Sequence, residues 1–198
     1  MKKTLLMAVM IVVGVVVVAG MMIGGIYNRL VGAEESVNGA WAQVQNVYQR
    51  RLDLIPNLVE TVKGYAAHEK ETLQGVVNAR AQVGQVKISP DIVSNPEMLD
   101  QFQKAQGRLS SALSRLLVVA EKYPDLKANE NFLMLQTQLE GTENRITVER
   151  MKFNDTARQF NTLIRTFPNN FVARFGGFAK KAYFEADQAA AKVPAVKF

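Results

Sequence analysis

An uncharged, strongly apolar run near the start of the sequence constrains the fold of this chain more than any other feature. Two lysines precede it, and no charged residue occurs from Thr4 to Asn28. The 23 residues from Thr4 to Ile26 would form a helix of roughly 34 Å, which is enough to cross a hydrocarbon core of about 30 Å. We therefore expect residues 1–27 to form a single transmembrane helix, since no second apolar run approaches this length.

The alternative for this run is a signal peptide that is removed after export. Signal peptides have apolar regions of about 7–15 residues followed by a cleavage site made of small residues. The run in this chain is longer, and its last part, VAGMMIGG, makes a poor cleavage site. The sequence therefore favours a retained membrane anchor.

The charges on either side of the span predict its orientation. Lys2 and Lys3 precede the span, whereas Arg29 on the other side is soon followed by two glutamates. The positive-inside rule then places the N-terminus in the cytoplasm and the following domain outside the bacterial inner membrane. Within the span, Gly20 and Gly24 form a G-x-x-x-G motif, which can let two membrane helices pack closely, although glycine is common in such helices. We treat both glycines as candidate self-association contacts.

Composition limits the chemistry and the partners of the other 171 residues. The two leading lysines supply part of the net charge of +6, so the rest of the chain carries +4. Such a mildly basic surface suits anionic lipid headgroups, whereas nucleic-acid binding would call for a dense Lys and Arg block, which the sequence lacks. The chain has no cysteine, which excludes disulfides, thiol catalysis and a lipid-modified cysteine as the anchor.

Apolar residues recur at spacings of three and four through nearly all of the sequence after the span, which predicts an all-α fold. Long stripes of this kind, joined by short polar segments, indicate an elongated antiparallel bundle of three or four helices. The stripes cover about residues 37–83, 97–122 and 129–167. We assign residues 28–178 to the bundle domain and residues 179–198, which are rich in Ala and Lys, to a poorly ordered tail.

A proline interrupts the first of these stripes. If one helix continues through Pro56, the proline removes a backbone hydrogen bond and kinks the helix. If Asp53 instead caps a new helix, Pro56 falls in the first turn of that helix, where it is tolerated. The sequence leaves both alternatives open, and Asp53 and Pro56 mark the expected structural break.

Polar residues on the apolar seam of the last long helix predict a special feature of the core. Thr142 and Glu149 fall on this seam. They indicate either a small shift of register or a buried polar layer that includes an arginine from a facing helix.

Pairs of adjacent like charges usually lie on solvated faces, and we interpret the lysines at 180–181 in this way. For the arginines at 50–51 a structural ion pair with Asp53 or Glu143 is a second interpretation.

The segment NTLIRTFPNNFVARFGGF places unusual aromatic content near the end of the bundle. After Pro168, phenylalanines recur at spacings of four and three, which predicts a short amphipathic helix over residues 170–178. This helix could fold back as a lid on the bundle end, contact another protomer, or dip into the lipid headgroups. The candidate lid or self-association contacts are Phe171, Arg174, Phe175 and Phe178.

Three stretches of the sequence together resemble the LemA family. They are the apolar anchor, AWAQVQNVYQRRLDLIPNLVETVKGYAAHE (40–69) and ENFLMLQTQLEGTENRITVERMKFNDTARQFNTLIRTFPNNFVARFGGF (130–178). The resemblance extends from about Val37 to Phe178, and its most specific part is RRLDLIPNLV followed much later by ENRI and FNTLIRTFPNN. It implies one N-terminal membrane helix and a long helical bundle, and it brings no enzyme activity with it.

The residues themselves carry no recognisable catalytic or metal-binding pattern. His68 is the only histidine, and although Glu71 lies one helical turn further on, a metal site in a bundle needs more ligands. Ser110, Ser111 and Ser114 have no histidine partner in their helix, and glycine-rich nucleotide motifs are absent. We therefore expect no enzyme activity, no cofactor and no bound metal.

Two functions fit these observations. The first is a non-enzymatic, membrane-anchored scaffold whose copies self-associate to organise or shape a bacterial membrane. The alternative is an accessory module that presents its bundle to another protein of the cell envelope. The expected partners are the lipid bilayer, further copies of the chain and, in the alternative, an envelope protein, but not nucleic acid.

Overall fold

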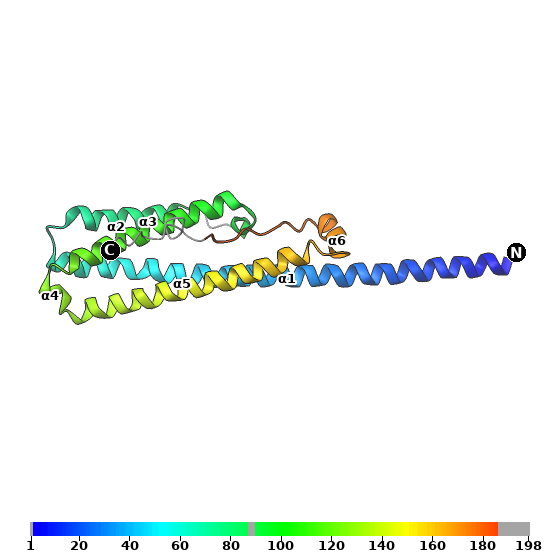
Figure 1. Cartoon of the computed structure of the whole chain (residues 1–198), viewed down its shortest axis with the longest axis horizontal. Helices are drawn as coiled ribbons and strands as arrows, with labels where there is room; N and C mark the ends of the chain where they lie inside the picture. The colour runs from blue at the N-terminus through cyan, green and yellow to red at the C-terminus, as the bar shows by residue number, and fades with distance from the viewer. Residues whose placement is uncertain (1, 87–89, 186–198) are drawn as a thin grey trace, which may run out of the picture.

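The structure, a computed structural model, describes residues 2–86 and 90–185, and one helix runs along most of its length (Figure 1). This helix, α1 (Lys2–Tyr65), contains 64 residues. The described residues contain no strand, so the predicted all-α class is confirmed. The other elements are α2 (Lys70–Gln85), the 3-10 helix η1 (Pro90–Ser94), α3 (Pro96–Ala120), α4 (Pro124–Lys127), α5 (Glu130–Leu163) and α6 (Asn169–Gly176).

Four of these helices form the predicted elongated bundle. The second half of α1 packs along α5, and α2 packs along α3 (Figure 1). One apolar cluster lies between these helices at the end that α4 closes, and it includes Val62, Leu116 and Leu139. A second, aromatic cluster around Trp41 and Phe102 lies nearer the span. The core therefore follows the whole bundle, as expected for an elongated antiparallel arrangement.

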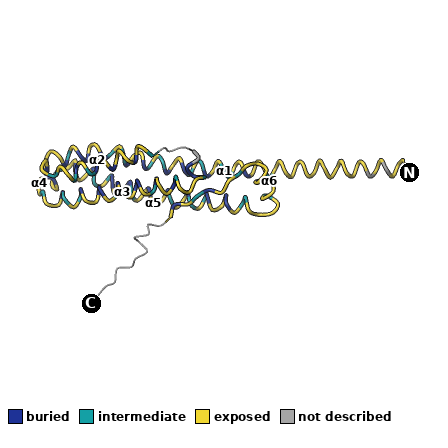
Figure 2. Tube along the Cα trace, turned by 90° about the horizontal axis from the view of Figure 1, so that it is seen from above, coloured by how far each residue is buried: buried dark blue, intermediate teal, exposed yellow. Residues whose placement is uncertain are grey.

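The first part of α1 stands apart from the bundle (Figure 2). Its apolar side chains, as far as the structure describes them, are exposed up to Ile23, and the first of them to be buried is that of Leu30. Among the described residues, α1 is the one helix that is long and apolar enough to cross a membrane, and its apolar window has no buried residue. An apolar helix that the protein leaves uncovered is typical of a single-pass membrane anchor.

Helix α1 continues through Pro56, so of the two alternatives that the sequence left open, the structure shows one continuous helix rather than a new helix that starts at Asp53. Asp53 does not cap a new helix, because its side chain accepts a 2.8 Å hydrogen bond from the amide of Gln49 one turn earlier in the same helix. Proline has no N–H to donate, which leaves the carbonyl of Leu52 without its usual helical partner. The Nε–H of Arg80 in α2 donates to this carbonyl at 3.1 Å.

Asparagine caps define the starts of α3 and α5. The side chain of Asn95 accepts hydrogen bonds from the backbone N–H groups of Glu97 and Met98, and Pro96 occupies the first turn of α3. Asn129 caps α5 in the same way by accepting from the N–H of Phe132 at 3.0 Å. Both caps satisfy backbone donors that a helix start leaves free, which explains why the chain turns sharply at these points.

The C-terminal region differs from the predictions in three respects. Helix α5 ends at Leu163 rather than near 167, and α6 ends at Gly176. Gly177 terminates α6 because its φ of 75° is a left-handed conformation that glycine adopts readily. Residues 179–185, expected to be poorly ordered, form an extended segment along the bundle, which we call the strap. The rest of the expected tail, residues 186–198, lies outside the described residues.

Candidate functional site

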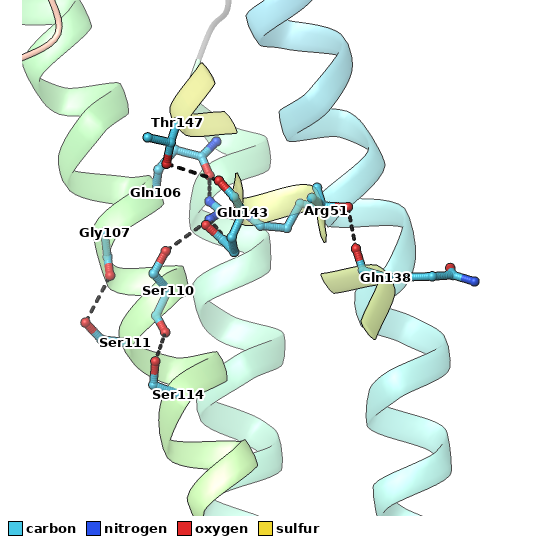
Figure 3. Close-up of polar contacts among 10 residues, drawn as sticks. Arg51, Gln106, Gly107, Ser110, Ser111, Ser114, Gln138, Glu143 and Thr147 are labelled. Carbon is cyan, nitrogen blue, oxygen red and sulfur yellow. Dashed lines mark hydrogen bonds and ion pairs between the residues drawn. The ribbon is translucent and has the colours of Figure 1, made fainter. Parts of the chain in front are cut away.

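A buried arginine joins three helices in the middle of the bundle (Figure 3). Arg51 of α1 is 1% exposed. One of its terminal nitrogens donates to the Glu143 carboxylate on α5 at 2.7 Å and to the Ser110 hydroxyl on α3 at 3.0 Å. The other terminal nitrogen donates to the side-chain oxygen of Gln106, also on α3. The predicted ion pair with Glu143 is therefore present, and the alternative partner, Asp53, is not used.

The surroundings of Arg51 identify this cluster as an internal connection rather than a ligand site. Its guanidinium carbon lies 5.2 Å from the centre of the Tyr48 ring, a cation–π arrangement. Burial raises the pKa of the Tyr48 hydroxyl, while the nearby positive charges of Arg150 and Arg51 act in the opposite direction. The protein supplies hydrogen-bond partners for both terminal nitrogens and an aromatic ring beside the guanidinium, so the charge of Arg51 is paired internally. Its Nε has no hydrogen-bond partner among the described residues.

The serines and the histidine considered in the sequence have other positions. The hydroxyls of Ser111 and Ser114 donate to backbone carbonyls one turn earlier in α3, and Ser110 accepts from Arg51. His68 is exposed in the turn between α1 and α2, and Glu71 lies in the first turn of α2. Among the described residues, no three His, Cys, Asp or Glu side chains are grouped as a metal site would need.

The polar residues on the α5 seam pair within their own helix. Thr142 is buried and donates to the carbonyl of Gln138 at 2.7 Å. Glu149 is also buried, and its carboxylate lies 3.0 Å from Lys152 and 3.8 Å from Arg145. The expected pairing with an arginine of a facing helix is wrong for Glu149, because that arginine reaches Glu143 instead.

The strap is held by side-chain amides that act as substitutes for a neighbouring strand. Asn161 of α5 donates to the carbonyl of Lys181 and accepts from its N–H, both at 2.8 Å. The side-chain amide of Asn154 likewise donates to the carbonyl of Phe184 and accepts from its N–H, both at 2.9 Å. Because each amide satisfies one donor and one acceptor, the extended backbone can be held without a β-sheet.

Side chains also fix the strap. Phe184 is 5% exposed and packs on Trp41 and Phe153, with ring centres 6.0 and 5.5 Å apart. Lys181 is also buried, and its ammonium group lies 2.7 Å from Glu34 of α1 and 3.1 Å from the hydroxyl of Ser94. The expectation that the lysines at 180–181 lie on a solvated face is therefore wrong for Lys181, although Lys180 is exposed.

Helix α6 closes the end of the bundle next to the span. Ala173 is buried, and Phe178 is half-buried against Phe160 of α5 and Tyr27 of α1, with ring centres 6.4 and 5.6 Å apart. Phe178 therefore occupies a lid position. Phe171 and Phe175, by contrast, are 56% and 90% exposed, so the structure does not place them as lid contacts.

An exposed group of aromatic and basic side chains remains at this end. Three arginines near the exposed rings, Arg29, Arg165 and Arg174, are themselves exposed, and their side chains make no hydrogen bond or ion pair with any described residue. Phe167 is 80% exposed and stacks edge-on against Phe171 at 6.0 Å. The α6 corner, as we name this surface, consists of Phe167, Phe171, Phe175, Arg29, Arg165 and Arg174.

An open pocket of about 700 Å³ adjoins the α6 corner between α1 and α5. Its lining includes Arg29, Arg158, Gln159 and Asn169. Arg158 is paired with Asp155 at 2.8 Å, whereas Arg29 is the cation in this pocket without a carboxylate partner among the described residues. The pocket therefore continues the α6 corner, with which it shares Phe167 and Arg29, along α5.

The glycines of the span are free to approach a partner helix. A Cβ added at Gly20 or Gly24 would meet nothing within 4 Å. Both residues lie in the part of α1 that the bundle does not cover. The structure therefore leaves the G-x-x-x-G surface open without assigning it a contact.

The fold and these sites define a single-span, membrane-associated helical bundle. Comparison with known proteins identifies the family, because the sequence profile of the LemA family matches residues 40–198. The chain therefore belongs to the LemA family, as its sequence resemblance indicated.

Curated relatives agree with this assignment. The chain is 27% identical to protein LemA of Metamycoplasma hominis over 161 residues, which cover 81% of this chain and 69% of that protein. It is 27% identical to magnetosome protein MamQ 2 of Paramagnetospirillum magneticum over 179 residues and 26% identical to magnetosome protein MamQ of Magnetospirillum gryphiswaldense over 174 residues. Both matches cover 80% of this chain and 64% of the relative, so the chain spans less than two thirds of these MamQ proteins. Neither the family nor these names indicate a catalytic class.

Proposed function

We propose that this protein is a membrane-anchored, non-enzymatic scaffold whose copies associate laterally and thereby organise or shape a bacterial membrane. The observation that carries the proposal is the continuity of α1, which passes from the apolar segment into the bundle core without a break. A flexible tether would let the bundle tumble, whereas a continuous helix restricts its orientation before any contact is made. Because association then costs less rotational freedom, weak contacts between neighbouring copies suffice.

Two further observations support a structural role. The buried polar groups of the bundle, such as Arg51 and Lys181, are engaged by the protein itself. Two buried side-chain nitrogens of the described residues, Nε1 of Trp41 and Nε of Arg51, have no hydrogen-bond partner. Exposed arginines whose side chains make no hydrogen bond or ion pair with a described residue lie beside the span, among them Arg29 and Arg174. The magnetosome names of the MamQ relatives are consistent with a role at a membrane, and we extend that association to this chain as part of the proposal.

The mass of the full-length protein in nanodiscs or mild detergent tests self-association. We expect a defined assembly larger than one chain. Replacing Gly20 and Gly24 by leucine should reduce it, since larger side chains hold two helices apart at a G-x-x-x-G contact. Gly25→Leu is the matched control, because Gly25 lies on another face of α1 and its Cβ would also meet open space. A monomeric wild-type protein would contradict the scaffold and turn attention to an envelope-protein partner.

We also propose that the N-terminus is cytoplasmic and the bundle lies outside the inner membrane. Lys2 and Lys3 support this orientation. The arginines that the fold brings beside the span belong to a long domain, and such domains cross the membrane largely regardless of their charge. Since the chain has no cysteine, a single Leu133→Cys can report the sidedness. Labelling of this variant by a membrane-impermeant maleimide in intact spheroplasts is expected, and labelling only after lysis would reverse the assignment.

A further inference from the structure

We propose that the α6 corner docks on the surface of the same bilayer that α1 crosses. Its exposed rings would lie at the boundary between headgroups and acyl chains, and its arginines would bind lipid phosphates. This is a second membrane contact, separate from the span. It rests on the anchoring of α1 in a membrane but does not depend on self-association.

The position of α6 along the rod is the first argument. Figure 1 shows α6 at the end of the bundle nearest the free part of α1. Phe178 fixes it there by packing on Tyr27, which directly follows the apolar run ending at Ile26. Tyrosine in this position is typical of the membrane–water interface. If residues up to Ile26 cross the hydrocarbon, α6 lies at the level of the headgroups.

The chemistry of the exposed side chains is the second argument. Phe167, Phe171 and Phe175 are 80%, 56% and 90% exposed, whereas Phe178 and Ala173 of the same segment serve the bundle. Three exposed phenylalanines within nine residues would be costly in water, but aromatic rings are favoured at the interface. The three exposed rings are therefore available to contact lipid, whereas they do not pack in the protein's own core.

The arginines complete the match to a lipid surface. Arg29, Arg165 and Arg174 are exposed and lack carboxylate partners among the residues described by the structure. A basic residue near an anionic membrane surface favours binding to it, and arginine binds phosphate through two parallel hydrogen bonds. Rings flanked by unpaired arginines are the combination that interfacial membrane elements use.

A second copy of the chain fits this surface less well. Figures 1 and 2 show that α6 lies toward the end of the bundle that the span leaves, rather than midway along the rod. Neighbouring rods that stand in one membrane would meet mainly along their sides. Docking on lipid would instead give each rod two contacts with the bilayer, the span and the α6 corner, and two contacts fix its tilt where one does not.

Tryptophan quenching by brominated lipids tests the proposal in the full-length protein. Nanodiscs that hold one copy and contain phosphatidylglycerol and phosphatidylcholine separate docking from self-association. Phe175→Trp is the probe, because this side chain is 90% exposed and its replacement disturbs no packing. Leu133→Trp at the far end of α5 is the control outside the membrane, and Val18→Trp is the control within the span. The chain has a single native tryptophan, the buried Trp41, and its fluorescence is measured in the wild-type protein and subtracted.

Docking predicts that lipids brominated high on the acyl chain quench Phe175→Trp several-fold more than Leu133→Trp. Replacing Arg165 and Arg174 by glutamine in the Phe175→Trp protein should reduce that quenching, and unchanged quenching would overturn the phosphate contacts. If Val18→Trp is quenched and Phe175→Trp behaves like Leu133→Trp, the anchor holds and the docking proposal is wrong. If Val18→Trp is not quenched either, the anchor itself fails.

Discussion

The ammonium group of Lys181 lies 2.7 Å from the carboxylate of Glu34, which joins residues 147 positions apart in the sequence. Glu34 belongs to the first turns of α1 inside the bundle, and Lys181 belongs to the strap. The lysine side chain is 7% exposed and the glutamate side chain 30%. This ion pair therefore ties the C-terminal strap to the helix that enters the membrane, at the end of the bundle nearest the span.

Removing the charge of Lys181 should loosen the strap. Lys181→Met keeps the aliphatic stem but deletes the donor to Glu34 and Ser94. We expect a loss of about 1 kcal/mol of local stability, because two partly buried acceptors lose their donor and water can replace part of that bonding. Hydrogen exchange at the amides of residues 181–185 measures this loss. Lys180→Met, at an exposed neighbouring position, is the matched control, and equal exchange in the two variants would contradict the importance of the ion pair.

Phe184 should couple the strap to the core of the bundle. Phe184→Ala removes a ring that packs on Trp41 and Phe153, and deletion of a buried phenylalanine costs about 3–5 kcal/mol. Because Trp41 is the single tryptophan, its fluorescence should shift to longer wavelength as water reaches the indole. Chemical denaturation followed by this signal gives the free energy of unfolding. An unshifted spectrum with unchanged stability would mean that the strap is not docked in solution.

The backbone bond between Arg80 and Leu52 should depend on the presence of Pro56. Arg80→Ala is expected to cost about 0.5–1.5 kcal/mol, the usual net value of one hydrogen bond. In a Pro56→Ala background the N–H of residue 56 can bond the Leu52 carbonyl itself, so the same Arg80→Ala change should cost less. The four free energies of unfolding form a double-mutant cycle. Additive effects would show that Arg80 does not compensate for the proline.

The helices could be predicted from the sequence, whereas the strap could not, and the reason is physical. Helical periodicity is a local property, so the stripes that contain Leu116 and Phe153 are visible without any tertiary information. The strap depends on Asn154 and Asn161, which look like ordinary polar positions of a helix. Nothing local indicates that their amides bond a segment some twenty to thirty residues further on. Composition alone therefore suggested disorder for residues 179–185.

The buried polar contacts also could be predicted only in part from the sequence. An ion pair of the arginines at 50–51 with Asp53 or Glu143 was one interpretation of the sequence, and the structure joins Arg51 to Glu143. Gln106 and Ser110 complete the cluster from α3, and no sequence signal singled them out as partners of an arginine. The sequence could not decide between the two alternatives at Pro56 because the compensating donor, Arg80, comes from a different helix. A sequence pattern can indicate an unsatisfied group but does not identify the group that satisfies it.

Arg51 should be among the most sensitive positions of the bundle. Arg51→Leu leaves the buried side-chain oxygen of Gln106 and the carboxylate of Glu143 without their donor. Because Glu143 is 40% exposed and water can replace part of the loss, we expect a cost of about 2–4 kcal/mol rather than the upper end for a broken buried pair. Arg50→Leu is the control at the adjacent exposed position and should change stability by less than about 0.5 kcal/mol. Similar urea midpoints for the two variants would contradict a structural role for Arg51.

The buried hydroxyl of Tyr48 should make the bundle sensitive to alkali. Burial raises the pKa of Tyr48 above its ordinary value of 10.0, so the folded protein holds this proton more tightly than the unfolded chain. The stabilisation from the neutral hydroxyl is fully present below about pH 10 and is lost as the pH rises through the folded pKa, because the unfolded chain loses its proton first. The Tyr48→Phe variant has no hydroxyl to ionise at this position, so it should lack this part of the loss of stability at alkaline pH. Urea unfolding of both proteins from neutral to alkaline pH measures the difference, in which the titration of lysines common to both proteins cancels. Parallel stability curves for the two proteins would show that Tyr48 ionises as easily in the folded bundle as in the unfolded chain.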